Sequence, residues 1–378
     1  MRAAAKDDLS AVDGSENVSP PSDIRLASAR QDAQHVVDLF ASRVSLHAQM
    51  TPLQFKLLNG FQRGFPLVPK PFQLIAEQLG ATEADVIEAL HYLQDRRAVS
   101  RVGAVFPPGR IGVGTLVALA VPPARLEEVA ALVSAHPEVN HNYQREHPYN
   151  LWFVAAAPSP ARLDQVLDDI EAETGLALIR LRLLEEFYID LGFDLSGGGK
   201  QTSTTRVLDA DMGCELPALE RALLAVLQEG LEIVPRPFAR LAEQAGLSEA
   251  MTLEMIEQWV ATGLIKRFGV IVRHRELGYR ANAMCVWDVP DEAVRGIGAR
   301  LAREPLVTLC YLRNRALPEW PYNLFCMIHG RSRGAVERSI EDMRTRLGLA
   351  RYPGSVLFSL RCFKQRGARY VEAEAAHA

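Results

Sequence analysis

The segment FQRGFPLVPKPFQLIAEQLG (61–80) returns later in the chain as LQEGLEIVPRPFARLAEQAG (227–246), and this repeat decides the fold. The two copies keep an offset of 166 residues over the stretch 57–103. A second pair, PYNLWF (148–153) and PYNLFC (321–326), follows at an offset of 173. A repeat of this length indicates two homologous halves in one chain. We therefore expect an internal pseudo-dimer whose differences show which half does chemistry.

Each half opens with the pattern of a helix-turn-helix unit. Apolar residues at helical spacing predict a helix over 52–62 and, after a Pro-rich turn, a short helix that ends at Gly80. Thr82 can cap a third helix, and residues 97–106 then alternate as a two-stranded wing would. The second half repeats this order over 219–272. Both halves are predicted to begin with a winged helix-turn-helix.

After each helical unit the pattern changes to strand, helix, strand, strand, helix, strand. This order predicts an α+β chain of two tandem repeats, each a winged helix-turn-helix followed by a ferredoxin-like βαββαβ domain. The expected elements are 116–121, 125–135, 139–147, 151–157, 161–173 and 177–188 in the first half, and 281–289, 292–303, 307–315, 323–329, 333–346 and 355–363 in the second.

Composition shifts place the expected domain boundaries. Residues 194–213 are rich in Gly, Ser and Thr and are interpreted as a flexible linker. The predicted divisions are a partly disordered tail over 1–47, helix-turn-helix units over 48–110 and 214–276, the linker over 194–213, and ferredoxin-like domains over 111–193 and 277–378.

The overall composition predicts a soluble cytoplasmic protein. Hydrophobic residues make up 48% and charged residues 23% of the chain. No apolar run approaches the ~20 residues that cross a bilayer, and the N-terminus lacks the apolar core of a secretion signal. The five cysteines have no CxxC spacing, which favours reduced thiols and disfavours a structural zinc site. We expect no membrane partner and no protein-bound metal.

Charge argues against DNA as a partner. The predicted third helix of the second half, within 248–263, has three Glu and no Lys or Arg. In the first half, Glu83, Asp85 and Glu88 precede the first Arg at position 96. Acidic helices repel the phosphates that such a helix must approach. We therefore expect the helical units to serve as packing scaffold.

The segment VNHNYQREHPYNLWF (139–153) is the strongest functional signal. As a strand of period two it would place His141, Tyr143, Arg145 and His147 on one face. Such side chains form a poor apolar core, but they can line a pocket for an anion or form an ordinary ion-pair network. In the second half the equivalent positions are Leu309, Tyr311, Arg313 and Arg315, so the histidines belong to one copy.

Basic residues elsewhere could add to an anion site. Arginine presents a fork that matches carboxylate geometry, so several together can clamp a polyanion. Each alone could instead be a solvated surface charge, and His329 could reach the same cavity or be a satisfied buried histidine. These residues include Arg101, Arg110, Lys266, Arg267, Arg273, His274, Arg275, Arg361, Lys364, Arg366 and Arg369.

Three segments carry a resemblance to a known family: NHNYQREHPYNLWFV in the first half, and RFGVIVRHRELGYRANAM and CYLRNRALPEWPYNLFCMIHG in the second. They resemble the sirohaem decarboxylases, which are Lrp/AsnC-like proteins. The resemblance covers about 51–370, with the first half similar to the D-type subunit and the second to the L-type subunit of a fused DL form. It implies removal of the acetate carboxyl groups at carbons 12 and 18 of sirohaem, giving 12,18-didecarboxysirohaem and CO2 on the route to haem d1. The implied partners are sirohaem, its decarboxylated products, other haem d1 pathway proteins and further copies of the chain, with no cofactor beyond the iron tetrapyrrole substrate.

The resemblance also suggests roles for the strand residues. We expect His147 to donate a proton, His141 to assist, Arg145 to orient substrate carboxylates and Tyr143 to hydrogen-bond one of them. The other side chains expected to bind substrate are Arg313, Arg315, Arg273, His274, Lys266, His329 and Arg361. The rival hypotheses are another tetrapyrrole-modifying reaction and a haem-responsive Lrp/AsnC-like transcriptional regulator.

Overall fold

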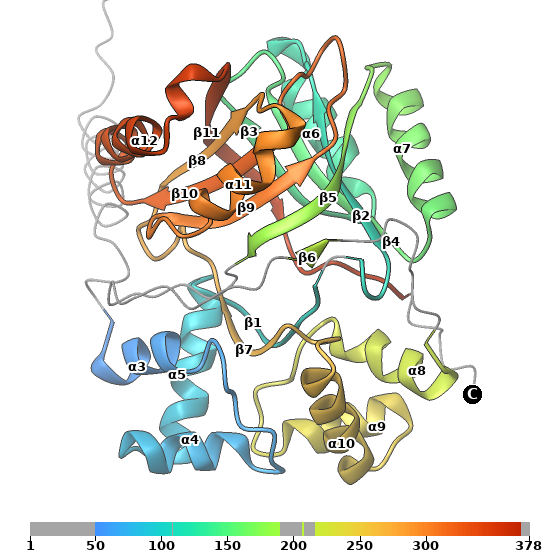
Figure 1. The fold of residues 1–378 in the computed structure, drawn as a ribbon. Helices are drawn as coiled ribbons and strands as arrows, with labels where there is room; N and C mark the ends of the chain where they lie inside the picture. The colour runs from blue at the N-terminus through green and yellow to red at the C-terminus, as the bar shows by residue number, and fades with distance from the viewer. Residues whose placement is uncertain (1–49, 108, 190–205, 208–215, 372–378) are drawn as a thin grey trace, which may run out of the picture.

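The computed structural model describes residues 50–107, 109–189, 206–207 and 216–371. The predicted tail over 1–47 and the predicted linker, apart from 206–207, lie outside the described residues. The described residues form two layers, with the two helical units side by side beneath one large sheet structure (Figure 1). Two tandem pairs of a helical unit and a mixed α/β unit are present, as predicted.

The helical units begin and end where the sequence supplies caps. Thr51 and Gln54 form a reciprocal capping box, and Thr82 and Asp85 form another. Gly80 has a φ of 69°, a left-handed conformation that favours glycine at a helix end. The helices are α3 (Pro52–Gly60), α4 (Pro71–Leu79) and α5 (Glu83–Asp95) in the first unit, and α8 (Ala218–Leu227), α9 (Pro237–Ala245) and α10 (Glu249–Ala261) in the second.

The prediction of a two-stranded wing in each half is wrong. Residues 97–106 contain a single strand, β1 (Val99–Val105), which pairs antiparallel with β7 (Arg267–Val272) of the other half. The two strands form a two-stranded ribbon that joins the halves. Gly103 and Gly269 are paired at the middle of this ribbon. The two halves are thus joined by backbone hydrogen bonds above their helices.

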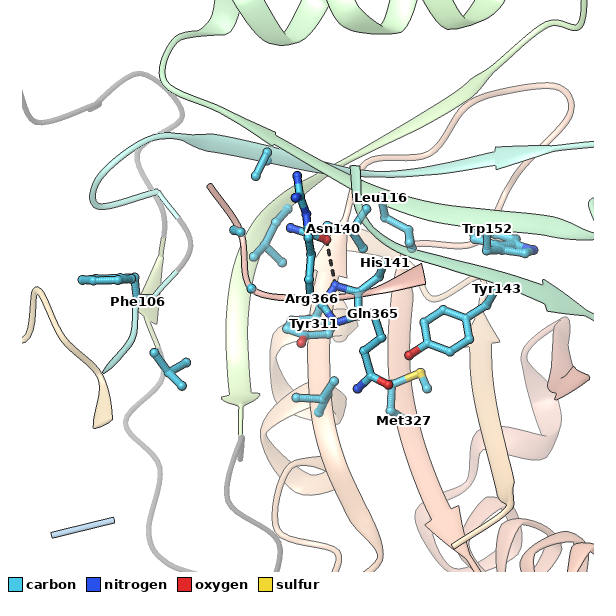
Figure 2. A pocket seen from close by; sticks show the side chains of 18 of the residues that line it. Phe106, Leu116, Asn140, His141, Tyr143, Trp152, Tyr311, Met327, Gln365 and Arg366 are labelled. Carbon is cyan, nitrogen blue, oxygen red and sulfur yellow. Dashed lines mark hydrogen bonds between the residues drawn. The ribbon is translucent and has the colours of Figure 1, made fainter. Parts of the chain in front are cut away.

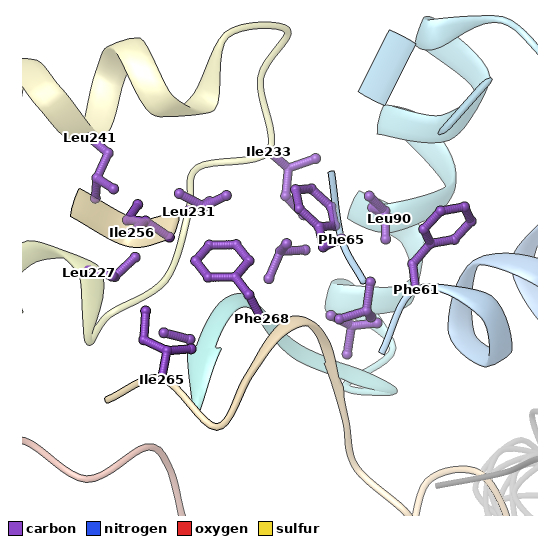
Figure 3. Close-up of a cluster of buried hydrophobic side chains, with 14 of the residues drawn as sticks. Phe61, Phe65, Leu90, Leu227, Leu231, Ile233, Leu241, Ile256, Ile265 and Phe268 are labelled. Atoms are coloured by element: carbon purple, nitrogen blue, oxygen red, sulfur yellow. The ribbon is translucent and has the colours of Figure 1, made fainter. Parts of the chain in front are cut away.

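One apolar core lies beneath the ribbon and is shared by both helical units (Figure 3). Phe65 of the first unit packs against Phe268 of the second, with ring centroids 5.9 Å apart. Leu90 and Ile233 belong to the same buried cluster. Shared burial of this kind holds the two units together as one body.

The mixed units form a closed barrel. In the first unit the strand order is β5-β2-β4-β3, and in the second it is β11-β8-β10-β9. The junctions are β3 with β11 and β5 with β9, all antiparallel, and the β2–β5 pairing closes the ring. The strands are β2 (Val113–Leu119), β3 (Val139–Arg145), β4 (Leu151–Ala157), β5 (Ile179–Ile189), β8 (Ala281–Trp287), β9 (Val307–Arg313), β10 (Leu324–Gly330) and β11 (Gly354–Gln365), with β6 (Arg206–Val207) added beside β5.

Helices cover the outside of the barrel, and its interior holds the site. Apolar side chains of the outer strand faces pack under these helices in two separate cores. The helices are α6 (Leu126–Ala135) and α7 (Pro160–Thr174) in the first unit and α11 (Asp291–Leu301) and α12 (Arg333–Leu347) in the second, with short 3-10 turns η1 (Pro123–Arg125) and η2 (Leu349–Arg351). Because side chains alternate along a strand, every other residue points into the barrel.

Candidate active site

A cavity of about 440 Å³ lies inside the barrel, on the side that faces the ribbon of β1 and β7. Each of the eight barrel strands contributes at least one side chain to its wall, and both ribbon strands contribute as well. The two halves therefore share this site. Figure 2 shows His141 and Tyr143 on one wall, with Tyr311 and Met327 from the second half.

The β3 wall carries His141, Tyr143 and Arg145 into the cavity, as strand alternation predicts. His141 Nδ1 forms a hydrogen bond of 2.7 Å with Asn140 Oδ1, and its ring stacks 6.3 Å from that of Tyr143. Burial, with a smaller effect of the Arg101 charge, lowers the pKa of His141 to about 4. His141 is therefore neutral at physiological pH.

Arg145 is a buried cation with unused donors. Its side chain is only 7% exposed, and Nη1 donates to Asn282 Oδ1 at 3.2 Å and to the Leu357 carbonyl at 3.1 Å. Its buried Nε has no hydrogen-bond partner. Burial lowers the pKa of Arg145 to about 10, which leaves it charged at neutral pH. A buried guanidinium without a carboxylate partner is a strong site for an incoming anion.

The β9 wall repeats the tyrosine and the arginine but not the histidine. Arg313 Nη1 donates to the Leu181 carbonyl at 2.7 Å, and its guanidinium lies 5.2 Å from the Tyr311 ring centre. Burial lowers the pKa of Arg313 to about 10 and raises that of Tyr311. Leu309 occupies the position equivalent to His141 and also lines the cavity. This wall can bind carboxylates but has no titratable group in the place of His141.

A second histidine locus comes from His274 and His329, whose ring centroids lie 5.2 Å apart. His329 Nε2 is 2.7 Å from Asn282 Nδ2, and Nδ1 is 2.9 Å from Thr308 Oγ1. Burial, followed by the charges of His274 and Arg145, lowers the pKa of His329 well below its ordinary value. His329 is thus a half-buried part of the cavity wall.

Three further arginines line the cavity on the side of the ribbon and of the segment after β11. Arg101 in β1 and Arg267 in β7 are equivalent residues of the two halves, and Arg366 follows β11. Arg101 Nη2 donates to the Ala104 carbonyl at 3.1 Å, and Arg267 Nη1 donates to the Gln62 carbonyl at 2.6 Å. Burial lowers the pKa of Arg101 and of Arg366. Arg101 and Arg267 stand at matching positions of the sequence repeat. That match alone does not distinguish arginines that line the cavity from arginines on the surface.

The charged side chains that line the cavity all carry the same sign. None of the described residues that form the wall is Asp or Glu. A polyanion entering this space meets fixed cations and no like charge. The arginines are Arg101, Arg145, Arg267, Arg313 and Arg366.

The structure places His147 outside the cavity lining, so its predicted position on the β3 face is corrected. Strand β3 ends at Arg145, and the His147 N–H donates to the Arg145 carbonyl at 3.0 Å, which breaks the alternation. The half-buried His147 ring lies 5.4 Å from Trp320. Burial lowers its pKa.

Four other expected substrate-binding residues also lie outside the described lining. Arg315 is held by Asp288 at 2.9 Å and Asp291 at 2.7 Å, because β9 ends before it. Lys266 is paired with Glu186. The other two are Arg361, which is paired with Glu127, and Arg273, whose N–H donates to the Ala98 carbonyl.

Across the described residues, no group of three or more His, Cys, Asp and Glu side chains is arranged to hold a metal ion. No described helix combines the length and the apolarity needed to cross a membrane.

The fold and the cavity define a ligand-binding Lrp/AsnC-type scaffold. The family described as "AsnC-like ligand binding domain" matches residues 110–187 and 276–364, and the "Siroheme decarboxylase NirDL-like HTH domain" matches residues 55–99 and 220–266. The chain is 45% identical over 326 residues to the siroheme decarboxylase NirDL subunit of Paracoccus denitrificans, covering 86% of this chain and 99% of that protein. The chain therefore belongs to the sirohaem decarboxylase family, whose members are carboxy-lyases, and the resemblance found in the sequence is confirmed.

Solved structures agree with this assignment. The crystal structure of the siroheme decarboxylase NirDL matches with a TM-score of 0.61 at 27% identity, covering 84% of this chain and 94% of that one. A second structure of that enzyme, in complex with an iron-uroporphyrin III analogue, matches with a TM-score of 0.61 at 26% identity, covering 84% and 93%.

Proposed function

We propose that this chain decarboxylates sirohaem at the acetate side chains of carbons 12 and 18, giving 12,18-didecarboxysirohaem and CO2 on the route to haem d1. The observation that carries the proposal is the cavity shared by both halves, which is lined by five arginines and by no acidic side chain among the described residues. Sirohaem presents carboxylates around its whole rim, so a ring of cations suits it. Membership of the sirohaem decarboxylase family supports the same substrate class.

Each decarboxylation breaks the bond between the acetate methylene and its carboxylate. CO2 leaves, the electron pair enters the conjugated macrocycle, and one proton from the protein converts the methylene carbon into a methyl group. The substrate itself thus supplies the electron sink. The protein must grip the carboxylates that stay, orient the one that leaves, and deliver a proton at the methylene carbon.

The proton donor we propose is His141, in place of His147. His141 lines the cavity between Arg101 and Tyr143, whereas His147 packs against Trp320 beyond the end of β3. Burial is the main cause of the low pKa of His141. Carboxylates of a bound substrate would raise that pKa by favouring the charged imidazolium, so substrate binding would load the proton that the reaction uses.

The two Tyr–Arg pairs, one on each wall of the cavity, are proposed to bind the substrate carboxylates that are retained. Arg145 and Arg313 each keep a buried Nε without a hydrogen-bond partner. Tyr143 and Tyr311 stay protonated at neutral pH, since burial raises both pKa values, and each can donate one hydrogen bond. His274 and His329 line the same space and are proposed to contact the second acetate.

The test is anaerobic incubation of the purified full chain with sirohaem, followed by mass spectrometry of the tetrapyrrole. We expect stepwise loss of one and then two CO2 with no other mass change. Sirohaem that stays intact with fully folded protein would refute the decarboxylase. A different mass change would indicate another tetrapyrrole-modifying reaction, and sirohaem-dependent retention of specific DNA without turnover would indicate a regulator.

A further inference from the structure

The repeat is interrupted by an insertion at one end of the barrel. Its offset is 168 at Arg145/Arg313 and 173 at Pro148/Pro321, so the loop between β9 and β10 has five residues more than the loop between β3 and β4. The extra residues form a compact turn in which the main chains of Ala316 and Trp320 bond to each other at 2.9 and 2.7 Å.

This turn places Trp320 inside the barrel. The side chain is fully buried, and its ring centroid lies 5.0 Å from that of Trp152 and 6.3 Å from that of Phe325. Trp152 and Phe325 line the cavity, whereas Trp320 is not part of its surface. The insertion therefore supplies a second aromatic layer behind the two aromatic side chains of the cavity wall.

The Trp320 indole is held in place by side-chain packing rather than by a hydrogen bond. Trp320 Nε1 is buried and has no hydrogen-bond partner, while Trp152 Nε1 donates to the Tyr149 carbonyl at 2.7 Å. Tyr322 packs on another side of the Trp320 ring, at 5.0 Å. Closely packed aromatic layers resist compression, so the position of Trp320 fixes the position of Trp152 and Phe325.

We propose that Trp320 is a positioning residue that sets how far the tetrapyrrole enters the barrel, and thereby the distance from the scissile acetate to the proton donor. The proposal rests on the proposed decarboxylase function. The positioning role is inferred from the insertion between β9 and β10, because the shorter loop between β3 and β4 has no residue equivalent to Trp320. A shift of about 1 Å in such a distance can reduce the rate ~100-fold.

The test compares Trp320→Ala, Trp320→Phe and Leu317→Ala in the full chain, by kcat, KM and product mass with sirohaem. Leu317 belongs to the same turn but is 69% exposed, so Leu317→Ala serves as the matched control. Trp320→Ala is expected to lower kcat by ~10- to 100-fold with KM within ~3-fold, and to accumulate the mono-decarboxylated product. Trp320→Phe keeps an aromatic ring and removes the unpaired N–H, so it should fold like the parent and lose less than ~10-fold in kcat.

The outcomes separate the two proposals. An inactive parent protein refutes the decarboxylase itself. An active parent together with an unchanged kcat in folded Trp320→Ala, or a change in KM alone, refutes the positioning role. If Trp320→Ala does not fold, Trp320→Phe and Trp320→Leu decide the matter, since equal kcat and equal product ratios in both would overturn the proposal.

Discussion

The two walls of the cavity differ at one position of a common pattern. The first-half wall on β3 reads His141, Tyr143, Arg145, and the second-half wall on β9 reads Leu309, Tyr311, Arg313. The tyrosine and arginine are kept in both halves with the same pKa directions, although Arg145 is buried and Arg313 is half-buried. Binding groups are thus duplicated, while this titratable group is present on one side only.

The surroundings of the two tyrosines extend this difference. Tyr143 is paired across the sheet with Cys362, whereas Tyr311 is paired with Glu186. Glu186 is nearly buried and ion-paired to Lys266. A symmetric scaffold therefore presents an asymmetric electrostatic environment.

The largest effect is expected from copying the second wall onto the first. His141→Leu removes the proposed proton donor and should lower kcat by ~10²- to 10⁴-fold, the usual contribution of a positioned general acid. The measurement is single-turnover mass spectrometry with sirohaem. His147→Leu is the comparison variant and should lose less than ~10-fold, because leucine keeps an apolar side chain packed against Trp320. The reverse ranking of the two variants would return the role to His147.

The next largest effect concerns the binding of substrate carboxylates, which both walls are proposed to share. Arg145→Met and Arg313→Met should each raise the dissociation constant for sirohaem ~10- to 100-fold, because each removes charge-assisted hydrogen bonds worth about 1.5–3 kcal/mol. Arg145→Met should in addition lower kcat, since Arg145 also holds Asn282 beside His329. Binding is measured by anaerobic absorbance titration. No change in affinity for either variant would exclude these arginines as carboxylate ligands.

A smaller effect is expected in the ribbon above the cavity. A Cβ on Gly269 would lie 2.4 Å from the Phe61 carbonyl oxygen, whereas one on Gly103 would lie 3.0 Å from the Gly230 Cα. Gly269→Ala should therefore reduce the free energy of unfolding by about 1–3 kcal/mol, and Gly103→Ala by less. Urea unfolding of the two variants checks this ranking. If both variants were as stable as the parent protein, the ribbon would accommodate the added methyl groups without a cost in free energy.

The smallest effect is a pH dependence of stability. The pKa of His141 is about 4 in the folded protein against 6.5 ordinarily, so between these values the unfolded chain binds more protons. The free energy of unfolding should therefore fall as the pH decreases from about 6.5 to about 4. His141→Leu should make this decrease shallower without removing it, because the pKa of His329 is lowered as well. An identical pH profile in variant and parent would contradict the burial of a neutral His141.

Much of the fold could be predicted because the repeat fixes the element order twice. The cavity residues on β3 and β9 followed from strand alternation, which holds as far as Arg145 and Arg313. His147 and Arg315 were misplaced because strand ends depend on turns whose geometry a sequence pattern does not give. The pairing of β1 with β7 and the partners of Lys266 and Arg361 depend on long-range contacts, which local periodicity does not encode.

Both halves build one site with unequal walls, and the binding stoichiometry of sirohaem tests this shared site most directly. Anaerobic titration of the purified full chain with sirohaem, at protein concentrations well above the dissociation constant, should saturate at one equivalent per chain. Saturation at two equivalents per chain would mean that each half holds its own substrate, and would contradict the shared cavity.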